Sequence, residues 1–400
     1  MTDLLKPRDA KDVEAAVQWA LGDGKTLEVL GHGTKRGIGR AAQWDLSLDL
    51  SGLSGVTLYE PEELVLSAKA GTPLSEIEAL LAAHNQELAF EPMDYGALLG
   101  TPGGGTLGGA LAANLSGPRR IKAGAARDHF LGFTAVSGRG ETFKSGGRVV
   151  KNVTGYDLCK VMAGSYGTLA VMTDVTVKVL PRAETEETVL VLGPDDAAAA
   201  KAMSAAMGSA NDVSGAAHLP AAVAASVTQA GAGRAVTALR LEGVAPSVVH
   251  RRQALETLLK GFGTLANLDE AASRSFWKNI REVMAFVNDD RVLWRISAAP
   301  ARGHEIAAAI GEGADYCYDW AGGLIWLALP PSDDGAAARV RRAVAATGGH
   351  ATLIRAPAAM RAAVAVFEPQ EAAVAALTRR LKESFDPKGV LNPGRMYAGV

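Results

Sequence analysis

Gly31-His32-Gly33-Thr34-Lys35-Arg36-Gly37 and Thr101-Pro102-Gly103-Gly104-Gly105-Thr106-Leu107-Gly108-Gly109 are the two stretches that decide the fold of the first third of this chain. They lie about seventy residues apart, each beside an apolar run. Glycine-rich turns let successive backbone N–H groups converge on an anion, because no Cβ obstructs them. Together the two loops predict a clamp for one long ligand with a diphosphate. For either loop alone, a tight turn without a ligand is the alternative.

The composition predicts a globular protein of two or three domains. The chain has 400 residues, of which 48% are hydrophobic and 21% charged. Its 41 basic and 43 acidic residues give a net charge of −2, which argues against nucleic-acid binding. The N-terminal residues lack an apolar signal segment, and no run of eighteen apolar residues occurs. We therefore expect a cytoplasmic protein.

Cysteines and histidines give no pattern for a metal centre. Cys159 and Cys317 are too few for a disulfide framework or a four-cysteine iron–sulfur centre, so we expect two buried, inert thiols. The seven histidines are dispersed, without the short spacings that bring two imidazoles onto one metal. The sequence therefore predicts no metal site.

Hydrophobic periodicity predicts an α+β chain. Apolar spacing indicates a helix over 11–21 and a buried strand over 27–30 that runs into the first loop. A second helix is expected to start with Thr72 as its N-cap, Pro73 in its first position and Glu76 completing the cap. From residue 188 on, strands alternate with Ala-rich helices, which predicts helices on one face of an antiparallel sheet.

These elements predict three segments. Residues 1–182 form the ligand-binding domain, and 183–356 form an α+β cap or substrate domain. Residues 357–400 form a C-terminal helix and tail that return to the first domain.

Two common nucleotide-binding motifs do not fit the loops. The dinucleotide fingerprint needs a helix directly after its glycines, but Gly31 and Gly33 are followed by Gly37, Gly39 and then a strand. A P-loop needs Gly-Lys followed by Ser or Thr, which neither loop contains.

Five segments, in order, resemble the flavoenzymes related to vanillyl-alcohol oxidase. They are Gly31–Thr34, Pro102–Gly109 with Asn114 behind it, Asn152–Leu158, Ala163–Ala170, and the tail from Phe385-Asp386-Pro387 to Asn392-Pro393-Gly394-Arg395. The resemblance implies a PCMH-type FAD-binding domain of two α/β subdomains. It also implies a ferredoxin-like α+β cap with an antiparallel sheet.

The resemblance further implies non-covalent FAD. The first loop would surround the diphosphate, the second would continue towards the flavin, and 164–171 would lie near the adenine. The cofactor-binding residues expected on this basis are Gly31, His32, Gly33, Thr34, Lys35, Gly37, Pro102, Gly103, Gly104, Thr106, Leu107, Gly108, Asn114, Gly155, Tyr156, Gly164, Gly167, Thr168 and Val171.

Within the family the chain is similar to the FAD-binding E subunits of bacterial glycolate oxidases. This similarity implies oxidation of glycolate to glyoxylate in a complex with a homologous D subunit and an iron–sulfur F subunit, and a peripheral place at the inner membrane through these partners. The alternatives are a self-sufficient dehydrogenase of another 2-hydroxy acid, such as D-lactate, and a scaffold subunit without catalysis.

The chain departs from the family at two places. Relatives that oxidise 2-hydroxy acids often carry H-x-x-D-G-N-x-H, but no two histidines here are seven positions apart. Tyr166 stands where the family usually has Glu. The first departure leaves open whether this chain catalyses alone.

Oxidation of a 2-hydroxy acid needs a base for the hydroxyl proton and a cation for the carboxylate, which Arg matches best. Candidate cations are Arg281, Arg295, Arg355 and Arg395, each with a structural alternative, and His350 is a candidate base or a structural residue. No catalytic residue is assigned. Tyr156 and Tyr166 are expected near the flavin or in the core, and Phe276, Trp277 and Trp320 at an interface or in the core.

Overall fold

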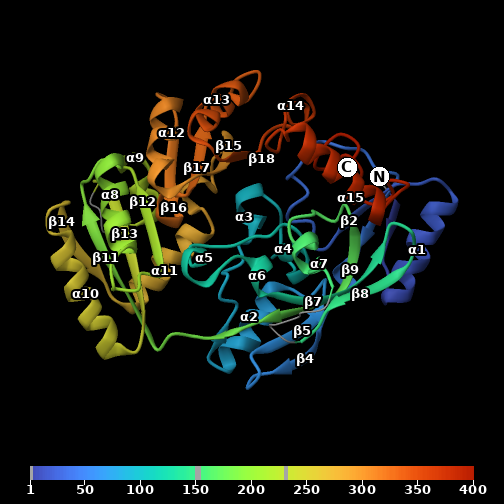
Figure 1. The fold of residues 1–400 in the computed structure, drawn as a ribbon, viewed down its shortest axis with the longest axis horizontal. Coiled ribbons are helices and arrows are strands. Elements are labelled where there is room, and N and C mark those ends of the chain that lie inside the picture. The colour runs from blue at the N-terminus through green and yellow to red at the C-terminus, as the bar shows by residue number, and fades with distance from the viewer. Residues whose placement is uncertain (1–2, 149–154, 229–232) are drawn as a thin grey trace. The chain divides into compact units, whose positions relative to one another are not determined.

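The computed structural model describes residues 3–148, 155–228 and 233–400. The chain divides into two compact units (Figure 1). Unit 1 combines 1–116, 124–182 and 369–400, and unit 2 combines 117–123 with 183–368.

Unit 1 holds a three-stranded parallel sheet in the order β1-β3-β2. Its strands are β1 (Asp3–Leu5), β2 (Leu27–Leu30) and β3 (Leu46–Asp49), and the 3-10 helix η1 (Leu50–Gly52) follows β3. Asp9 is the N-cap residue of helix α1 (Ala10–Gly22), and its carboxylate accepts hydrogen bonds from two following backbone N–H groups. Its apolar positions Val13, Val17 and Ala20 are fully buried in the core of this sheet, as the helical spacing predicted.

The second sheet of unit 1 has five antiparallel strands in the order β4-β5-β9-β7-β8. They are β4 (Val56–Glu60), β5 (Val65–Lys69), β7 (Phe130–Ser137), β8 (Thr142–Gly146) and β9 (Ala170–Lys178). The other elements of the unit are α2 (Leu74–Ala83), β6 (Gln86–Glu87), α3 (Tyr95–Leu99), α4 (Leu107–Ala112), α6 (Ala126–His129), α7 (Leu158–Met162), β10 (Leu180–Pro181) and α15 (Ala372–Phe385). Side chains of β5, β7 and β9 form one core with those of α2, α4 and α7.

The predicted cap of α2 is wrong by one position. The helix begins at Leu74 with Pro73 as its N-cap residue, and no side chain caps it. The Thr72 hydroxyl instead donates to the carbonyl of Lys69, at 2.7 Å, and accepts from the N–H of Gly55, at 3.0 Å. Thr72 is fully buried, so these tertiary partners replace the local cap.

Unit 2 is built on an eight-stranded antiparallel sheet in the order β14-β11-β13-β12-β16-β17-β15-β18. The strands are β11 (Thr185–Leu192), β12 (Gly215–Leu219), β13 (Val236–Gly243), β14 (Thr264–Leu268), β15 (Val292–Ser297), β16 (Asp315–Asp319), β17 (Leu324–Leu329) and β18 (His350–Arg355). The helices are α5 (Arg120–Ala123), α8 (Asp196–Met207), α9 (Ala221–Val227), α10 (Ala245–Leu259), α11 (Glu270–Arg281), α12 (Gly303–Ile310), α13 (Ala337–Thr347) and α14 (Ala358–Ala363), with the 3-10 helices η2 (Met284–Phe286), η3 (Pro300–Arg302) and η4 (Trp320–Gly322).

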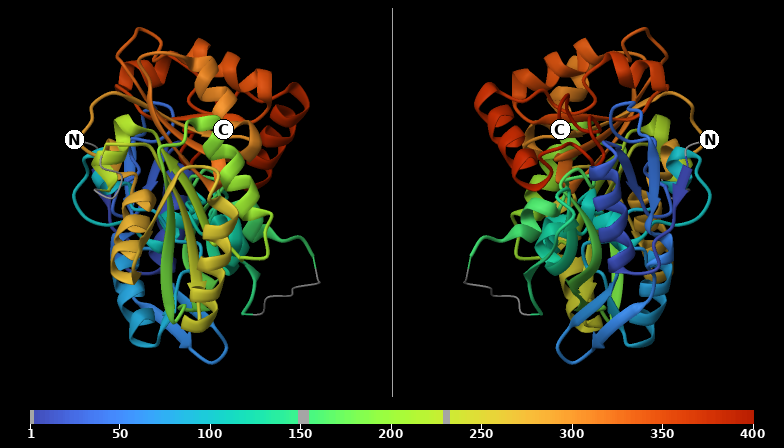
Figure 2. Two further views of the ribbon diagram at one scale, coloured as in Figure 1. Left: turned by 90° about the vertical axis from the view of Figure 1, so that its left-hand side faces the viewer. Right: turned by 90° about the vertical axis from the view of Figure 1, so that its right-hand side faces the viewer.

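Helices lie on both faces of this sheet, whereas the sequence predicted one covered face. Along β11, Val189 and Val191 share a core with α10, while Thr188 on the other face is hydrogen-bonded to Trp277 and Ser273 of α11. Figure 2 shows the green strands between these two yellow and gold helices. The alternation of a β-strand explains this arrangement, because successive side chains point to opposite faces.

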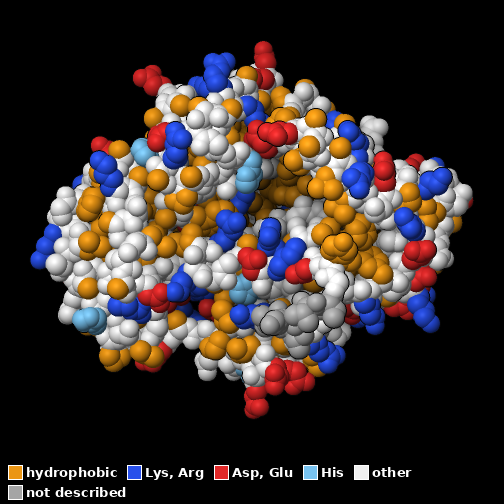
Figure 3. Space-filling model, viewed as in Figure 1, with side chains coloured by type: hydrophobic (Ala, Val, Ile, Leu, Met, Phe, Trp, Pro, Cys, Tyr) orange, Lys and Arg blue, Asp and Glu red, His pale blue; other side chains and the backbone are white. Residues whose placement is uncertain are grey.

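Unit 2 includes two segments beyond the predicted 183–356. Residues 117–123 belong to it, and it continues to Glu368. Arg341 and the N–H of Ala351 both bind the Glu368 carboxylate, and Leu353 N–H donates to Val366 O at 2.8 Å. These bonds add the segment after β18 to the unit. Figure 3 shows Lys and Arg interspersed with Asp and Glu on the visible face.

Candidate functional site

The two glycine loops touch each other in unit 1. A Cβ placed at Gly31 would lie 2.6 Å from Thr106 Oγ1, so this approach requires glycine. The ring Nδ1 of His32 lies 2.8 Å from the carbonyl oxygen of Gly104. The first loop directly follows β2, and the second leads into α4, whose N-cap residue is Thr106.

The first loop leaves its backbone donors open. Among the described residues, the N–H groups of His32, Gly33, Thr34 and Lys35 have no hydrogen-bond acceptor. Gly33 has a φ of 74°, in the left-handed region. Consecutive N–H groups around a left-handed residue form an anion-binding concavity, so the loop has the geometry of a phosphate site.

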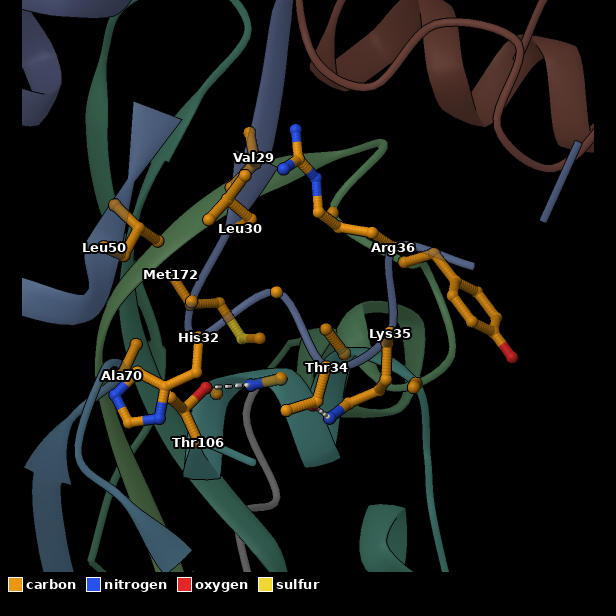
Figure 4. Close-up of a pocket in the computed structure, with 18 of the residues that line it drawn as sticks. Val29, Leu30, His32, Thr34, Lys35, Arg36, Leu50, Ala70, Thr106 and Met172 are labelled. Carbon is orange, nitrogen blue, oxygen red and sulfur yellow. Dashed lines mark hydrogen bonds between the residues drawn. The ribbon is translucent and has the colours of Figure 1, made fainter. Parts of the chain in front are cut away.

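A cavity opens between the loops, with about 730 Å³ of space including its mouth. Figure 4 shows residues that line it, with the Thr34 and Lys35 side chains joined by a hydrogen bond. Residues 29–36 line one side, and the remaining lining residues are Leu50, Ala70, Thr106, Gly108, Gly109, Ala112, Ala113, Tyr166, Gly167, Ala170, Met172 and Arg395.

Lys35 supplies a titratable cation to this cavity. Its ammonium donates to Thr34 Oγ1 at 3.0 Å, and burial lowers the pKa of Lys35 to about 8. Asp94 raises this pKa and the positive charge of Arg395 lowers it. Arg36 has a different role, because its guanidinium pairs with the buried Glu28, with Nε to Oε1 at 2.8 Å. The charge of Arg36 is therefore compensated within the protein.

The C-terminal tail supports the cavity from a distant part of the sequence. The Asn392 side chain accepts from Val29 N–H at 2.9 Å and donates to Tyr166 O at 2.9 Å. Arg395 donates to the carbonyl of Lys35 at 2.9 Å. The tail thus joins β2, the first loop and the segment around Tyr166. Tyr166 has a φ of 52°, so the residue in place of the family Glu sits in a left-handed turn at the cavity.

The structure brings together part of the predicted cofactor set. Gly31 to Lys35, Thr106, Gly108 and Gly167 line the cavity. Gly37, Pro102, Gly103 and Gly104 lie on the loops but outside this lining, and Gly155, Gly164 and Thr168 also lie outside it. Leu107 and Val171 are fully buried core residues, and Asn114 accepts a hydrogen bond from Arg127 N–H. Tyr156 is 92% exposed, and Asn152, Val153 and Thr154 lie outside the described residues.

Sequence reasoning missed the apolar walls of the cavity. Leu50 of η1, Ala70 directly after β5 and Met172 of β9 line it, and no local motif distinguishes them from other core residues. Gly108 was expected to approach the ligand, and a Cβ there would also lie 2.7 Å from the Cβ of Ala70. Close backbone packing is therefore a second reason for that glycine.

The candidate substrate arginines have different surroundings. Arg355 donates to the carbonyls of Phe286 and Arg291, at 2.8 and 3.1 Å, so it supports the backbone of unit 2. Arg281 pairs with Glu282 at 2.6 Å. Arg395 lines the cavity of unit 1, and Arg295 lies on strand β15 of unit 2.

Aromatic residues considered for an interface are in the core. Phe276, Trp277 and Trp320 are each less than 5% exposed. The thiols of Cys159 and Cys317 are buried, and burial raises the pKa of both, that of Cys159 to about 12. In the described ranges, no cluster of His, Cys, Asp and Glu has a metal-binding arrangement, and no helix has the length and hydrophobicity to cross a bilayer.

Comparison with known proteins agrees with this geometry. A family model described as "FAD binding domain" matches residues 3–146. Glycolate oxidase subunit GlcE of Escherichia coli (strain K12) is 33% identical over 386 residues, covering 96% of this chain and 95% of that protein. This chain belongs to the GlcE family. It is therefore an FAD-linked oxidoreductase related to that subunit.

Two further comparisons concern the sequence and the fold. An uncharacterized FAD-linked oxidoreductase, Rv2280, of Mycobacterium tuberculosis (strain ATCC 25618 / H37Rv) is 27% identical over 98% of this chain and 90% of its own. The structure of 4-ethylphenol oxidase from Gulosibacter chungangensis superimposes with a TM-score of 0.73 at 14% identity, covering 99% of this chain and 89% of that one. The second match confirms the predicted fold of FAD-binding domain and antiparallel cap.

Proposed function

We propose that this GlcE-family chain is the FAD-bearing subunit of a glycolate-oxidising complex, which converts glycolate to glyoxylate. The observation that carries the proposal is the cavity of unit 1, where the first glycine loop presents open backbone N–H groups and touches the second loop. The near full-length relation to GlcE supports the choice of substrate and complex.

The residues of the cavity fit a non-covalent dinucleotide. The N–H groups from His32 to Lys35 would hold the diphosphate, and the Lys35 ammonium would add a positive charge. Leu50, Ala70 and Met172 provide apolar walls. FAD, when bound, supplies the group that accepts a hydride from the substrate.

The electrons must then leave the chain through a partner. Its two cysteines are too few for a four-cysteine iron–sulfur cluster, so an external acceptor is needed. We therefore propose a complex with a D-type flavoprotein and an iron–sulfur F subunit, located in the cytoplasm and peripheral to the membrane through those partners.

The experiment is a visible spectrum of the protein purified alone, followed by denaturation and anaerobic addition of glycolate to the native sample. A yellow protein that releases FAD on denaturation and stays oxidised supports a subunit that needs its partners. Bleaching by glycolate would show a self-sufficient dehydrogenase. A colourless sample that does not take up added FAD would contradict the proposal and favour a scaffold.

A further inference from the structure

Two arginines of unit 2 stack on one tryptophan. The guanidinium carbon of Arg120 lies 4.2 Å from the centroid of the Trp320 ring, and that of Arg295 lies 5.0 Å from it. Arg295 also lies 6.0 Å from the ring of Trp326. Residues 120 and 295 are far apart in sequence, so only the fold of the unit brings them to this ring.

The segment that carries Arg120 is firmly anchored. Arg119 donates two hydrogen bonds to the Glu242 carboxylate, at 2.6 and 3.1 Å. The indole N–H of the buried Trp320 donates to the carbonyl of Gly117 at 2.9 Å. Arg120 is itself exposed, so its position is set by its neighbours while its guanidinium stays accessible.

Arg295 lies on the sheet face that also carries His350. In the strand register, Arg295 of β15 pairs with Trp326 of β17 and with Thr352 of β18. His350 is two residues from Thr352 and therefore points to the same face. Burial and the positive charges of Arg295, Arg120 and Arg341 lower the pKa of His350 against the opposing charge of Glu368.

Arg295 differs from neighbouring arginines in its lack of a carboxylate partner. Arg291, directly before β15, pairs with Asp289 and Asp315, at 2.6 and 2.8 Å, and Arg341 pairs with Glu368. Arg295 is only partly exposed, and across the described ranges its side chain makes no ion pair and no hydrogen bond. Its stacking on the rings leaves the planar N–H edge free, which is the edge that binds a carboxylate in bidentate fashion.

We propose that Arg295 and Arg120, held against Trp320, form a binding site for a small carboxylate anion. Its assignment to a 2-hydroxy acid rests on the proposed function, but the anion site rests on unit 2 alone. Arg295 contributes the bidentate contact, Arg120 the second charge, and Trp320 fixes both guanidiniums.

The test is calorimetric titration of the purified protein with oxalate, a carboxylate that cannot be oxidised at a C–H bond, at constant ionic strength. Arg295→Met and Arg120→Met are compared with Arg302→Met, which removes an exposed arginine paired with Glu305 in the same unit. We expect each of the first two changes to weaken oxalate binding about tenfold or more, and the control to leave it unchanged. FAD content and circular dichroism check that each variant is folded.

Two results would overturn the site: oxalate binding by Arg295→Met as tight as by the unchanged protein, or no binding by the unchanged protein at about 10 mM oxalate. Failure of the proposed function has a different signature. If the protein takes up no FAD but both arginine variants bind oxalate more weakly, the proposed function fails and the proposed anion site stands. If the protein is yellow but both variants bind oxalate as tightly as the unchanged protein, the proposed anion site fails.

Discussion

At the residue scale, the cavity of unit 1 depends on glycine at position 31, which has no side chain, and on the ammonium of Lys35. Gly31 permits contact between the loops, because any Cβ there would overlap Thr106. Lys35 places an ammonium beside Thr34, where the protein interior disfavours its charge unless an anion binds. Both residues were predicted from sequence as parts of the cofactor site, which remains a proposal.

Gly31→Ala is expected to separate the two loops. Overpacking at such a contact costs about 1–3 kcal/mol, so FAD affinity should fall about tenfold or more. Gly22→Ala is the matched control, because a Cβ at Gly22 meets no atom within 4 Å. Dissociation constants from flavin fluorescence measure the effect, and equal FAD affinity in the two variants would contradict it.

Lys35 is expected to make FAD binding depend on pH. A bound diphosphate favours the protonated ammonium, so affinity should be highest below pH 8 and fall as pH rises through the pKa of about 8. Lys35→Met should bind FAD more weakly at pH 7 and show a flatter pH profile. The exposed Lys25, paired with Asp45, provides the control Lys25→Met. A Lys35→Met profile parallel to that of the unchanged protein would refute the role of Lys35.

At the scale of elements, helix α15 is joined to other segments of unit 1 by the buried ammonium of Lys382. The Lys382 ammonium donates to Asp386 at 2.7 Å and to the carbonyls of Thr168 and Leu391, at 2.6 and 2.8 Å. Asp386 also accepts from the N–H groups of Val390 and Leu391. These bonds set the direction in which the tail leaves the helix.

Lys382→Met is expected to destabilise unit 1 strongly. Removal of one partner leaves the Asp386 carboxylate, 1% exposed, without its counter-charge, and such losses cost about 3–5 kcal/mol. Arg379→Met on an exposed part of the same helix should change the free energy of unfolding little. Urea unfolding followed by circular dichroism measures both variants. A loss below about 1 kcal/mol for Lys382→Met would be evidence against this role.

At the scale of the whole molecule, unit 1 is discontinuous, since 369–400 complete a domain that begins near the N-terminus. The N–H of Leu27 donates to Val390 O at 2.7 Å, and Asn392 N–H donates to Leu27 O at 2.9 Å. The tail therefore continues the hydrogen bonding of β2, the strand that leads into the first loop.

A chain that ends at Glu368 is therefore expected to lose FAD binding. Without the tail, β2 loses these bonds and the cavity loses Arg395. Gel filtration of the shortened protein with added FAD, followed by its absorbance spectrum, measures retention. A shortened chain that retains FAD in equal molar amount would contradict the expectation.

The sequence predicted the helices and strands with clear periodicity and the two loops, because each depends on residues close together in the chain. It predicted the two buried thiols from the small number of cysteines, and the family from five short motifs in their order along the chain. Tertiary structure alone decided that Arg36 faces Glu28, that Arg355 binds backbone carbonyls, and that Arg120 and Arg295 meet at Trp320. Tertiary contacts also gave the Thr72 hydroxyl a backbone partner in place of the predicted helix cap, and they placed α11 on the second face of the sheet. Partners of this kind lie many positions apart, so no local pattern specifies them. They pair because a polar group that is buried on folding costs free energy unless it forms a hydrogen bond or an ion pair.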